Sequence, residues 1–141
     1  MAERTVRMNY RAIVVATVAC FLLEVVWYAG FINLWMAGTG RTLEWYRATA
    51  MSPWVQHLVA VAVTALVAMS LSCVVQATGE QTAMRGIRVA AMLWVGFVMP
   101  VWALEYVYEL RPWSLFGINA GFWLLGMILM GAIVGGWKAK A

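Results

Sequence analysis

Four long apolar stretches determine what this chain can fold into. They cover approximately residues 12–34, 53–77, 89–107 and 113–137, and a helix needs about 20 apolar residues to cross a bilayer. Only 11% of the residues are charged, whereas a water-facing domain typically carries about 25%. The sequence therefore predicts an all-α integral membrane protein. We expect an antiparallel bundle of four transmembrane helices that forms one domain over residues 1–141.

The connectors between the stretches indicate how the spans are arranged. The longest, residues 36–54, contains "RTLEWYRATA" (41–50), which mixes charged with aromatic side chains. This composition predicts a short helix that lies in the membrane interface. The connectors at 77–88 and 108–112 are short, so the spans that they join are expected to pack as antiparallel neighbours.

The distribution of basic residues predicts the orientation of the spans. Of the 10 Lys and Arg residues, most are expected on the side that carries both chain ends: Arg4, Arg7, Arg11, Arg85, Arg88, Lys138 and Lys140. The opposite side has Arg41, Arg47 and Arg111. By the positive-inside rule, both termini should therefore be cytoplasmic. The first apolar stretch is longer than a signal-peptide core, so we expect it to be retained as a span.

Each stretch carries a strongly polar residue in the half away from the chain ends, and we single out Glu24, His57, Glu105 and Asn119. A charge at the centre of a bilayer costs about 2.5–3.5 kcal/mol, so Glu24 is expected to face the interior of the bundle. There it can be protonated and hydrogen-bonded to His57 or Asn119, or it can belong to a proton- or ligand-linked site. Pro100, in the same half, is expected to kink the third span.

Aromatic side chains gather at the same level. The chain has nine Trp, and such residues either form a belt at the headgroup level or wall a cavity for an apolar ligand. Tyr28 follows Glu24 by about one turn, and Trp102 shares a helix face with Glu105. The candidate ligand-binding or proton-linked pocket comprises Glu24, Tyr28, His57, Trp102, Glu105, Arg111, Asn119 and Trp123.

The fourth stretch carries two G-x-x-x-G patterns, Gly117 with Gly121 and Gly131 with Gly135. At about 100° per residue, these four glycines lie near one helical face. Small residues let the backbones of membrane helices approach closely. The pattern predicts helix packing within the bundle, with a homo-oligomer interface as the alternative.

The sequence contains no recognised catalytic or metal-binding pattern. It has one His and lacks the paired His, Cys or Glu spacing of metal sites, and no phosphate loop or nucleophile motif is visible. Cys20 and Cys73 lie inside apolar stretches, where free cysteine packs as a small apolar side chain. The basic residues form no nucleic-acid-binding stripe. We therefore expect no catalytic residues, cofactor, metal or nucleic-acid partner.

The segment "ELRPWSLFGINAGFWLLGMILMGAIVGGW" (109–137) resembles a family of small bacterial membrane proteins known as "domain of unknown function 1761". That family has a similar E-x-R-x-x-x-L-F-x-I-N-A-G-(Y/F)-W core followed by a Gly-rich helix, and "LWVGFVMP" (93–100) resembles its preceding stretch. The resemblance implies a four-helix protein of the bacterial inner membrane and no particular reaction. It places Arg111 and Asn119 in the shared pattern, and Glu109 is near enough to pair with Arg111.

The sequence leaves three functional hypotheses open. The first is a non-catalytic membrane protein that binds an apolar or lipid-like ligand, or that serves as an accessory subunit of a larger membrane complex. Its partners would be the bilayer and either a complex partner or a second copy of the chain. The second is a small proton-coupled transporter with Glu24 as the carrier. The third is a small four-helix membrane enzyme that acts on a lipophilic substrate.

Overall fold

The computed structural model describes residues 8–49 and 51–138, and the regular structure within these ranges is helical, with no strand. Four of its helices are long and apolar enough to cross a membrane. They are α1 (Tyr10–Thr39), α3 (Pro53–Ala77), the continuous helix of α4 (Ala83–Leu93), η1 (Trp94–Val98) and α5 (Met99–Tyr108), and α6 (Trp113–Gly136). The short α2 (Leu43–Thr49) lies in the connector where an interfacial helix is predicted. The predicted four-helix membrane fold is confirmed.

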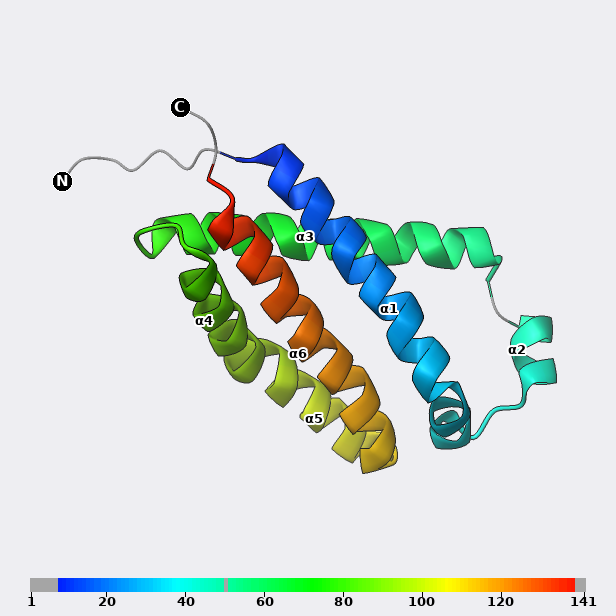
Figure 1. Cartoon of the computed structure of the whole chain (residues 1–141). Coiled ribbons are helices and arrows are strands. Elements are labelled where there is room, and N and C mark those ends of the chain that lie inside the picture. Colours follow the sequence, from blue (N-terminus) through cyan, green and yellow to red (C-terminus); the bar gives the residue numbers. More distant parts are fainter. Residues whose placement is uncertain (1–7, 50, 139–141) are drawn as a thin grey trace.

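The two ends of the molecule are defined by different contacts. Asn9 Nδ2 donates to the carbonyl oxygens of Trp137 (3.0 Å) and Lys138 (3.2 Å), so α1 begins where α6 ends. Gln81, in the turn between α3 and α4, donates to the Val134 carbonyl (2.6 Å) and lies at the same place. We call this the terminal end. The opposite end, which carries α2 and the turn between α5 and α6, is called the α2 end (Figure 1).

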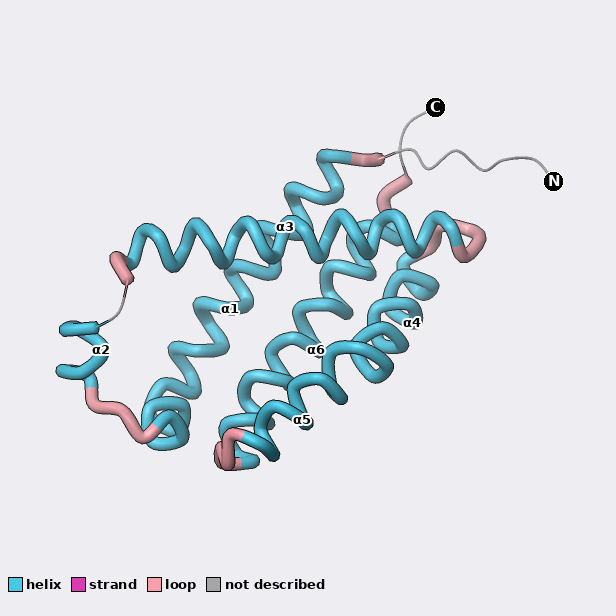
Figure 2. Tube along the Cα trace, turned by 180° about the vertical axis from the view of Figure 1, so that it is seen from behind, coloured by secondary structure: helices cyan, strands magenta, loops and turns pink. Residues whose placement is uncertain are grey.

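The helix α6 is central, because it packs against α1, α3, α4 and α5. Figure 1 shows α1, α6 and the α4–α5 helix side by side, while α3 crosses them at a steep angle, and Figure 2 shows the same crossing from behind. The buried residues of α3 all lie from the middle of the helix onward: Thr64, Ala68, Leu71, Ser72 and Val75. The first half of α3 therefore stands away from the bundle, which the sequence did not predict.

The terminal half of the bundle is held by close contact between glycines. A Cβ atom on Gly86 of α4 would overlap the carbonyl oxygen of Gly131 in α6, and one on Gly135 would lie 3.0 Å from the Cα atom of Gly86. The two backbones therefore touch, as the G-x-x-x-G pattern predicts. Gly121 packs against a side chain of α1, whereas nothing lies within 4 Å of the position of a Cβ on Gly117. Packing within the bundle thus explains three of the four glycines.

The third span changes direction at a π-turn in its middle. Pro100 has no N–H group, and in a regular helix its ring would clash with the carbonyl four residues earlier. In η1 the Met99 N–H instead donates to the carbonyl of Trp94, five residues earlier, which is the geometry of a π-turn. Figure 1 shows α4 and α5 at an angle to each other around this point. The kink predicted at Pro100 is present, and α5 packs much less extensively on α6 than α4 does.

Candidate functional site

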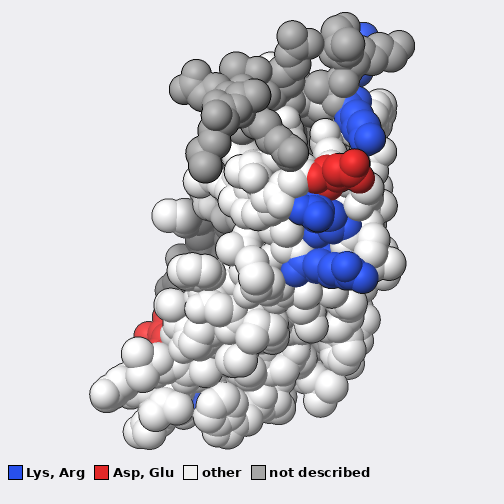
Figure 3. All heavy atoms as spheres, turned by 90° about the vertical axis from the view of Figure 1, so that its left-hand side faces the viewer, with Lys and Arg blue, Asp and Glu red and all other residues white. Residues whose placement is uncertain are grey.

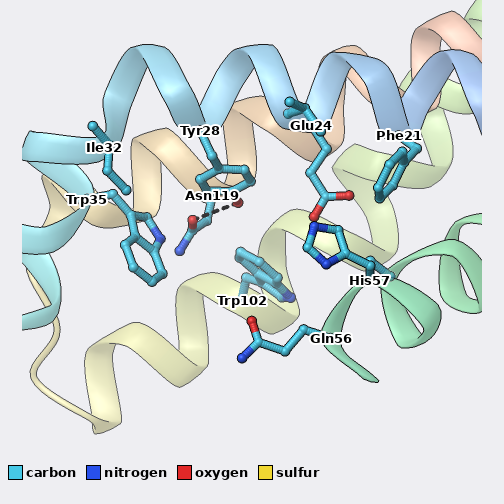
Figure 4. Close-up of a pocket in the computed structure, with 11 residues that line it drawn as sticks. Phe21, Glu24, Tyr28, Ile32, Trp35, Gln56, His57, Trp102 and Asn119 are labelled. Carbon is cyan, nitrogen blue, oxygen red and sulfur yellow. Dashed lines mark hydrogen bonds between the residues drawn. The ribbon is translucent and has the colours of Figure 1, made fainter. Parts of the chain in front are cut away.

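A cavity of about 510 Å³ lies between α1, α3, α5 and α6. Figure 4 shows side chains from these helices pointing into it. Its wall consists of Phe21, Glu24, Val25, Tyr28, Ile32 and Trp35 from α1, Gln56, His57 and Ala60 from α3, Trp102 from α5 and Asn119 from α6. The volume lies within the range of about 300–1,000 Å³ for small-molecule sites, which are also largely apolar with a few polar groups.

The steep crossing of α3 and the bend in the third span together create this cavity. Towards the terminal end the bundle is closed, because Cys20, Ala68 and Met130 are fully buried at 0% exposure. Towards the α2 end, α3 and α5 separate from α6, and the space between them is not filled by backbone contact. The cavity is open on the side of α3, since Gln56 and His57 line it and remain exposed.

Glu24 and His57 face each other across the cavity. Glu24 is half-buried, and Figure 4 shows its carboxylate pointing toward the imidazole ring. No hydrogen bond or ion pair joins the two side chains in the part of the chain that the structure describes. His57 Nδ1 lies 2.5 Å from the Pro53 carbonyl oxygen, which can only accept, so Nδ1 carries a proton. Nε2 is therefore the nitrogen left to interact with Glu24 or with a bound molecule.

Asn119 joins three helices through its side-chain amide. The hydroxyl of Tyr28 in α1 donates to Asn119 Oδ1 (2.9 Å), and Asn119 Nδ2 donates to the hydroxyl oxygen of Tyr106 in α5 (2.7 Å). Trp27 Nε1 adds a bond from α1 to the carbonyl of Ile118 (3.0 Å). Asn119 was one expected partner of Glu24, but the amide is used by the two tyrosines instead. This hydrogen-bond chain fixes the wall of the cavity at the α2 end.

The structure brings together five of the predicted pocket residues and separates the other three. Those that line the cavity are Glu24, Tyr28, His57, Trp102 and Asn119. Glu105 is exposed on α5 and does not line it. Trp123 packs against the hydrophobic core beside it. Arg111 forms an ion pair with Glu109 in the α5–α6 turn, as its position allowed, and lies beyond the cavity.

Tyr106 is a residue beside the cavity that was not predicted from the sequence. It is 3% exposed and holds Asn119, whereas the neighbouring Glu105 was expected to face inward. Trp102 and Tyr106 are four residues apart in α5 and therefore lie on one face of that helix, whereas Glu105 lies beside this face on the exposed side. The charged residue near the end of the span was expected inside, and the aromatic residue next to it took that place. The spacing of four residues from Trp102 was the signal that could have identified Tyr106.

No cluster of three or more His, Cys, Asp or Glu side chains suited to a metal ion occurs among residues 8–49 and 51–138. The cavity presents the carboxylate of Glu24, the imidazole of His57 and two side-chain amides, those of Gln56 and Asn119. Its polar groups are hydrogen-bonding groups placed in an apolar wall, which is the usual way that such a site orients a ligand.

Comparison with known proteins supports the resemblance seen in the sequence. The family model described as "Protein of unknown function (DUF1761)" matches residues 11–135. This range includes every residue of the cavity and all four membrane-spanning helices except the first residue of α1 and the last residue of α6. No curated protein and no solved structure gives a significant match. The chain therefore belongs to the DUF1761 family.

Proposed function

We propose that the protein is a non-catalytic membrane protein that holds an apolar or lipid-like small molecule in the cavity between α1, α3, α5 and α6. One observation carries the proposal: a space of about 510 Å³ is left between α1, α3, α5 and α6 and is lined by side chains from all four. Aromatic and aliphatic side chains such as Tyr28, Ile32 and Trp102 would contact the apolar body of the ligand. Glu24 and His57 would meet a polar group on it.

Access to the cavity is proposed from within the bilayer. The first half of α3 has few protein neighbours, with Trp54 at 85% and Leu58 at 70% exposure, so lipid would surround it. Gln56 and His57 lie on the same stretch and line the opening. A lipophilic molecule could pass between α1 and α3 without leaving the membrane.

A substitution that fills the cavity tests this function. Ala60 lines the cavity and Ala62, on the same helix, is exposed and does not. In native mass spectra of the full chain purified in a mild detergent, we expect a lipophilic adduct on the wild-type protein. Ala60→Phe should remove most of the adduct, because the ring occupies its space, and Ala62→Phe should retain it. Absence of any adduct, or equal loss in both variants, would count against the proposal.

Glu24→Gln should change the occupancy of the adduct and leave the thermal unfolding temperature almost unchanged. The glutamine keeps the size and hydrogen-bonding capacity of the side chain while removing its ionisable character, and among the described residues Glu24 forms no hydrogen bond or ion pair that the fold would lose. The measurement is native mass spectrometry alongside a thermal melt in the same detergent. A large loss of stability with unchanged occupancy would assign Glu24 a purely structural role.

The same spectra address the alternative of an accessory subunit. The exposed first half of α3 offers a surface for a partner helix or for a second copy of the chain. A stoichiometric protein partner in place of a small adduct would favour that role.

Proton-coupled transport is a second candidate, favoured by the way in which Glu24 faces His57 inside the membrane-spanning region. Intramembrane ionisable residues often serve proton relays. The candidate requires a path to the terminal end, which the fully buried Cys20, Ala68 and Met130 obstruct in this conformation. A pH-dependent flux in proteoliposomes that Glu24→Gln abolishes would support it, and an unchanged flux would rule Glu24 out as carrier.

We further propose that the protein lies in a bacterial inner membrane with both termini in the cytoplasm. Basic residues of the terminal end include Arg11, Arg85, Arg88 and Lys138; Arg4, Arg7 and Lys140 lie outside the described residues. Figure 3 shows basic side chains gathered toward this end above a wide uncharged surface. A fluorescent-protein fusion to the C-terminus should be bright and an alkaline phosphatase fusion inactive. The reverse result would contradict this orientation.

A further inference from the structure

A second, smaller hollow adjoins the cavity at the α2 end. Its volume is about 170 Å³, and it is lined by Trp35, Gly38, Thr39, Arg41, Tyr46, Arg111, Leu115 and Asn119. Trp35 and Asn119 line both spaces, so the two adjoin through these side chains. A molecule that follows these shared side chains would reach from the cavity to the smaller hollow.

The charges of the smaller hollow are both positive. Arg41 and Arg111 line it, and no carboxylate does. The Arg41 guanidinium lies 4.1 Å from the centre of the Trp45 ring and forms no ion pair within residues 8–49 and 51–138. A guanidinium stacked on a ring keeps its N–H donors free at its edge, where a planar or tetrahedral oxyanion can accept them.

Arg111 is also available to a ligand, although it already has a partner. Its ion pair with Glu109 is exposed, with 45% and 43% of the two side chains accessible. Exposed ion pairs of this kind contribute little to stability. The guanidinium also lies 5.6 Å from the centre of the Tyr106 ring, which links it to the hydrogen-bond chain of Asn119. An anion between Arg41 and Arg111 would compete only with Glu109.

The hollow lies at the depth where lipid headgroups are found. With 30 residues, α1 is about 45 Å long, and the hydrocarbon core of a bilayer is about 30 Å thick. The residues of α1 in the hollow, Trp35 to Thr39, are the last of that helix. Glu24 lies fifteen residues, or about 22 Å, from Thr39. The smaller hollow is thus interfacial, whereas the cavity beside it reaches into the apolar layer.

We propose that the ligand is an anionic amphiphile whose phosphate or carboxylate group is held by Arg41 and Arg111 while its apolar body occupies the cavity. This inference rests on the proposed function and adds the charge class of the ligand and the site of its headgroup. The basic hollow at the interface suits the anionic headgroup of such a molecule, and the adjoining aromatic cavity suits its apolar body.

Matched probes and variants test the headgroup site. The probes are hexadecyl phosphate, uncharged hexadecanol and inorganic phosphate, titrated against the full chain in uncharged detergent by native mass spectrometry. Arg41→Gln and Arg111→Gln should each weaken binding of hexadecyl phosphate by about tenfold, as expected for the loss of a charge-assisted hydrogen bond. Binding of hexadecanol should not change. Glu109→Gln should strengthen binding of hexadecyl phosphate, because it removes the competing carboxylate.

Arg47→Gln is the control, because Arg47 is exposed on α2 and lines neither space. It should leave the affinity for every probe unchanged. Equal weakening of hexadecyl phosphate binding by Arg47→Gln, or no effect of Arg41→Gln and Arg111→Gln, would overturn the headgroup site. The proposed function would still stand if hexadecanol bound and Ala60→Phe abolished that binding. Inorganic phosphate binding as tightly as hexadecyl phosphate would identify a free-anion site and overturn the amphiphile. Failure of both long-chain probes to bind would overturn both proposals.

Discussion

Gly86→Ala should lower the free energy of unfolding by about 3 kcal/mol, the upper range for overpacking a close contact. The added methyl group would overlap the carbonyl oxygen of Gly131, which is backbone and cannot rotate away. The two helices must therefore move apart, and van der Waals contact is the main force between helices in a membrane. Thermal unfolding in mild detergent, followed by circular dichroism, measures the loss.

Gly117→Ala is the matched control for this substitution. Gly117 belongs to the other G-x-x-x-G pattern, but no atom apart from the adjacent part of α6 itself lies within 4 Å of the position of its added Cβ. Because Ala is favoured over Gly in a helix by up to about 1 kcal/mol, this change should be neutral or slightly stabilising. Equal destabilisation at Gly117 and Gly86 would mean that contact between α4 and α6 is not the cause.

Asn119→Leu should cost about 2 kcal/mol of stability and also reduce occupancy of the cavity. It removes the bonds of 2.9 Å to Tyr28 and 2.7 Å to Tyr106, and hydrogen bonds between membrane helices contribute about 1 kcal/mol each. With both bonds lost, the side chain at position 119 no longer ties α5 and α1 to α6, and α1 keeps the bond from Trp27 to the Ile118 carbonyl. The wall of the cavity should therefore loosen, chiefly on the side of α5. The measurements are a thermal melt and native mass spectrometry of the same sample.

Three variants show whether the effect comes from these bonds. Tyr28→Phe and Tyr106→Phe each remove one bond and should each cost about half as much as Asn119→Leu. Asn33, which is exposed on α1, supplies the control, because Asn33→Leu removes an amide that faces away from the bundle and should cause no loss. If Asn33→Leu were as harmful as Asn119→Leu, general apolar substitution rather than the hydrogen-bond chain would be responsible.

Local sequence signals predicted the spans and several of their contacts. The predicted spans at 53–77 and 113–137 agree with α3 and α6 to within one residue, because Ser-Pro and Arg-Pro mark their starts and polar residues mark their ends. The first span was predicted to end at Leu34, but α1 continues to Thr39. The residues after Leu34 are still compatible with a helix, and the helix ends where Gly40 adopts a left-handed backbone conformation. The contact of Gly131 and Gly135 with α4 follows from their spacing.

The candidate site was predicted only in part, and the two failures have different causes. Glu24, Tyr28 and His57 lie together, as expected from their positions in the half of the spans away from the chain ends and from the single turn between Glu24 and Tyr28. Glu105 was wrong as a cavity residue because Trp102 and Tyr106, four residues apart in α5, form the inward face of that helix and leave Glu105 on the exposed side. Trp35 and Gln56 were not predicted, since nothing in a single helix says which neighbour will lie opposite or at what angle.

The sequence by itself determined that the chain forms four membrane-spanning helices, because so few charged residues cannot cover a water-facing surface and the apolar stretches have the length of a bilayer. It also determined that polar groups gather in one half of the spans. Only the tertiary structure decided that these groups surround a cavity. The steep crossing of α3 and the turn at Pro100 set the distances between helices, and such distances arise from contacts among residues far apart in the chain, such as Gly86 with Gly131.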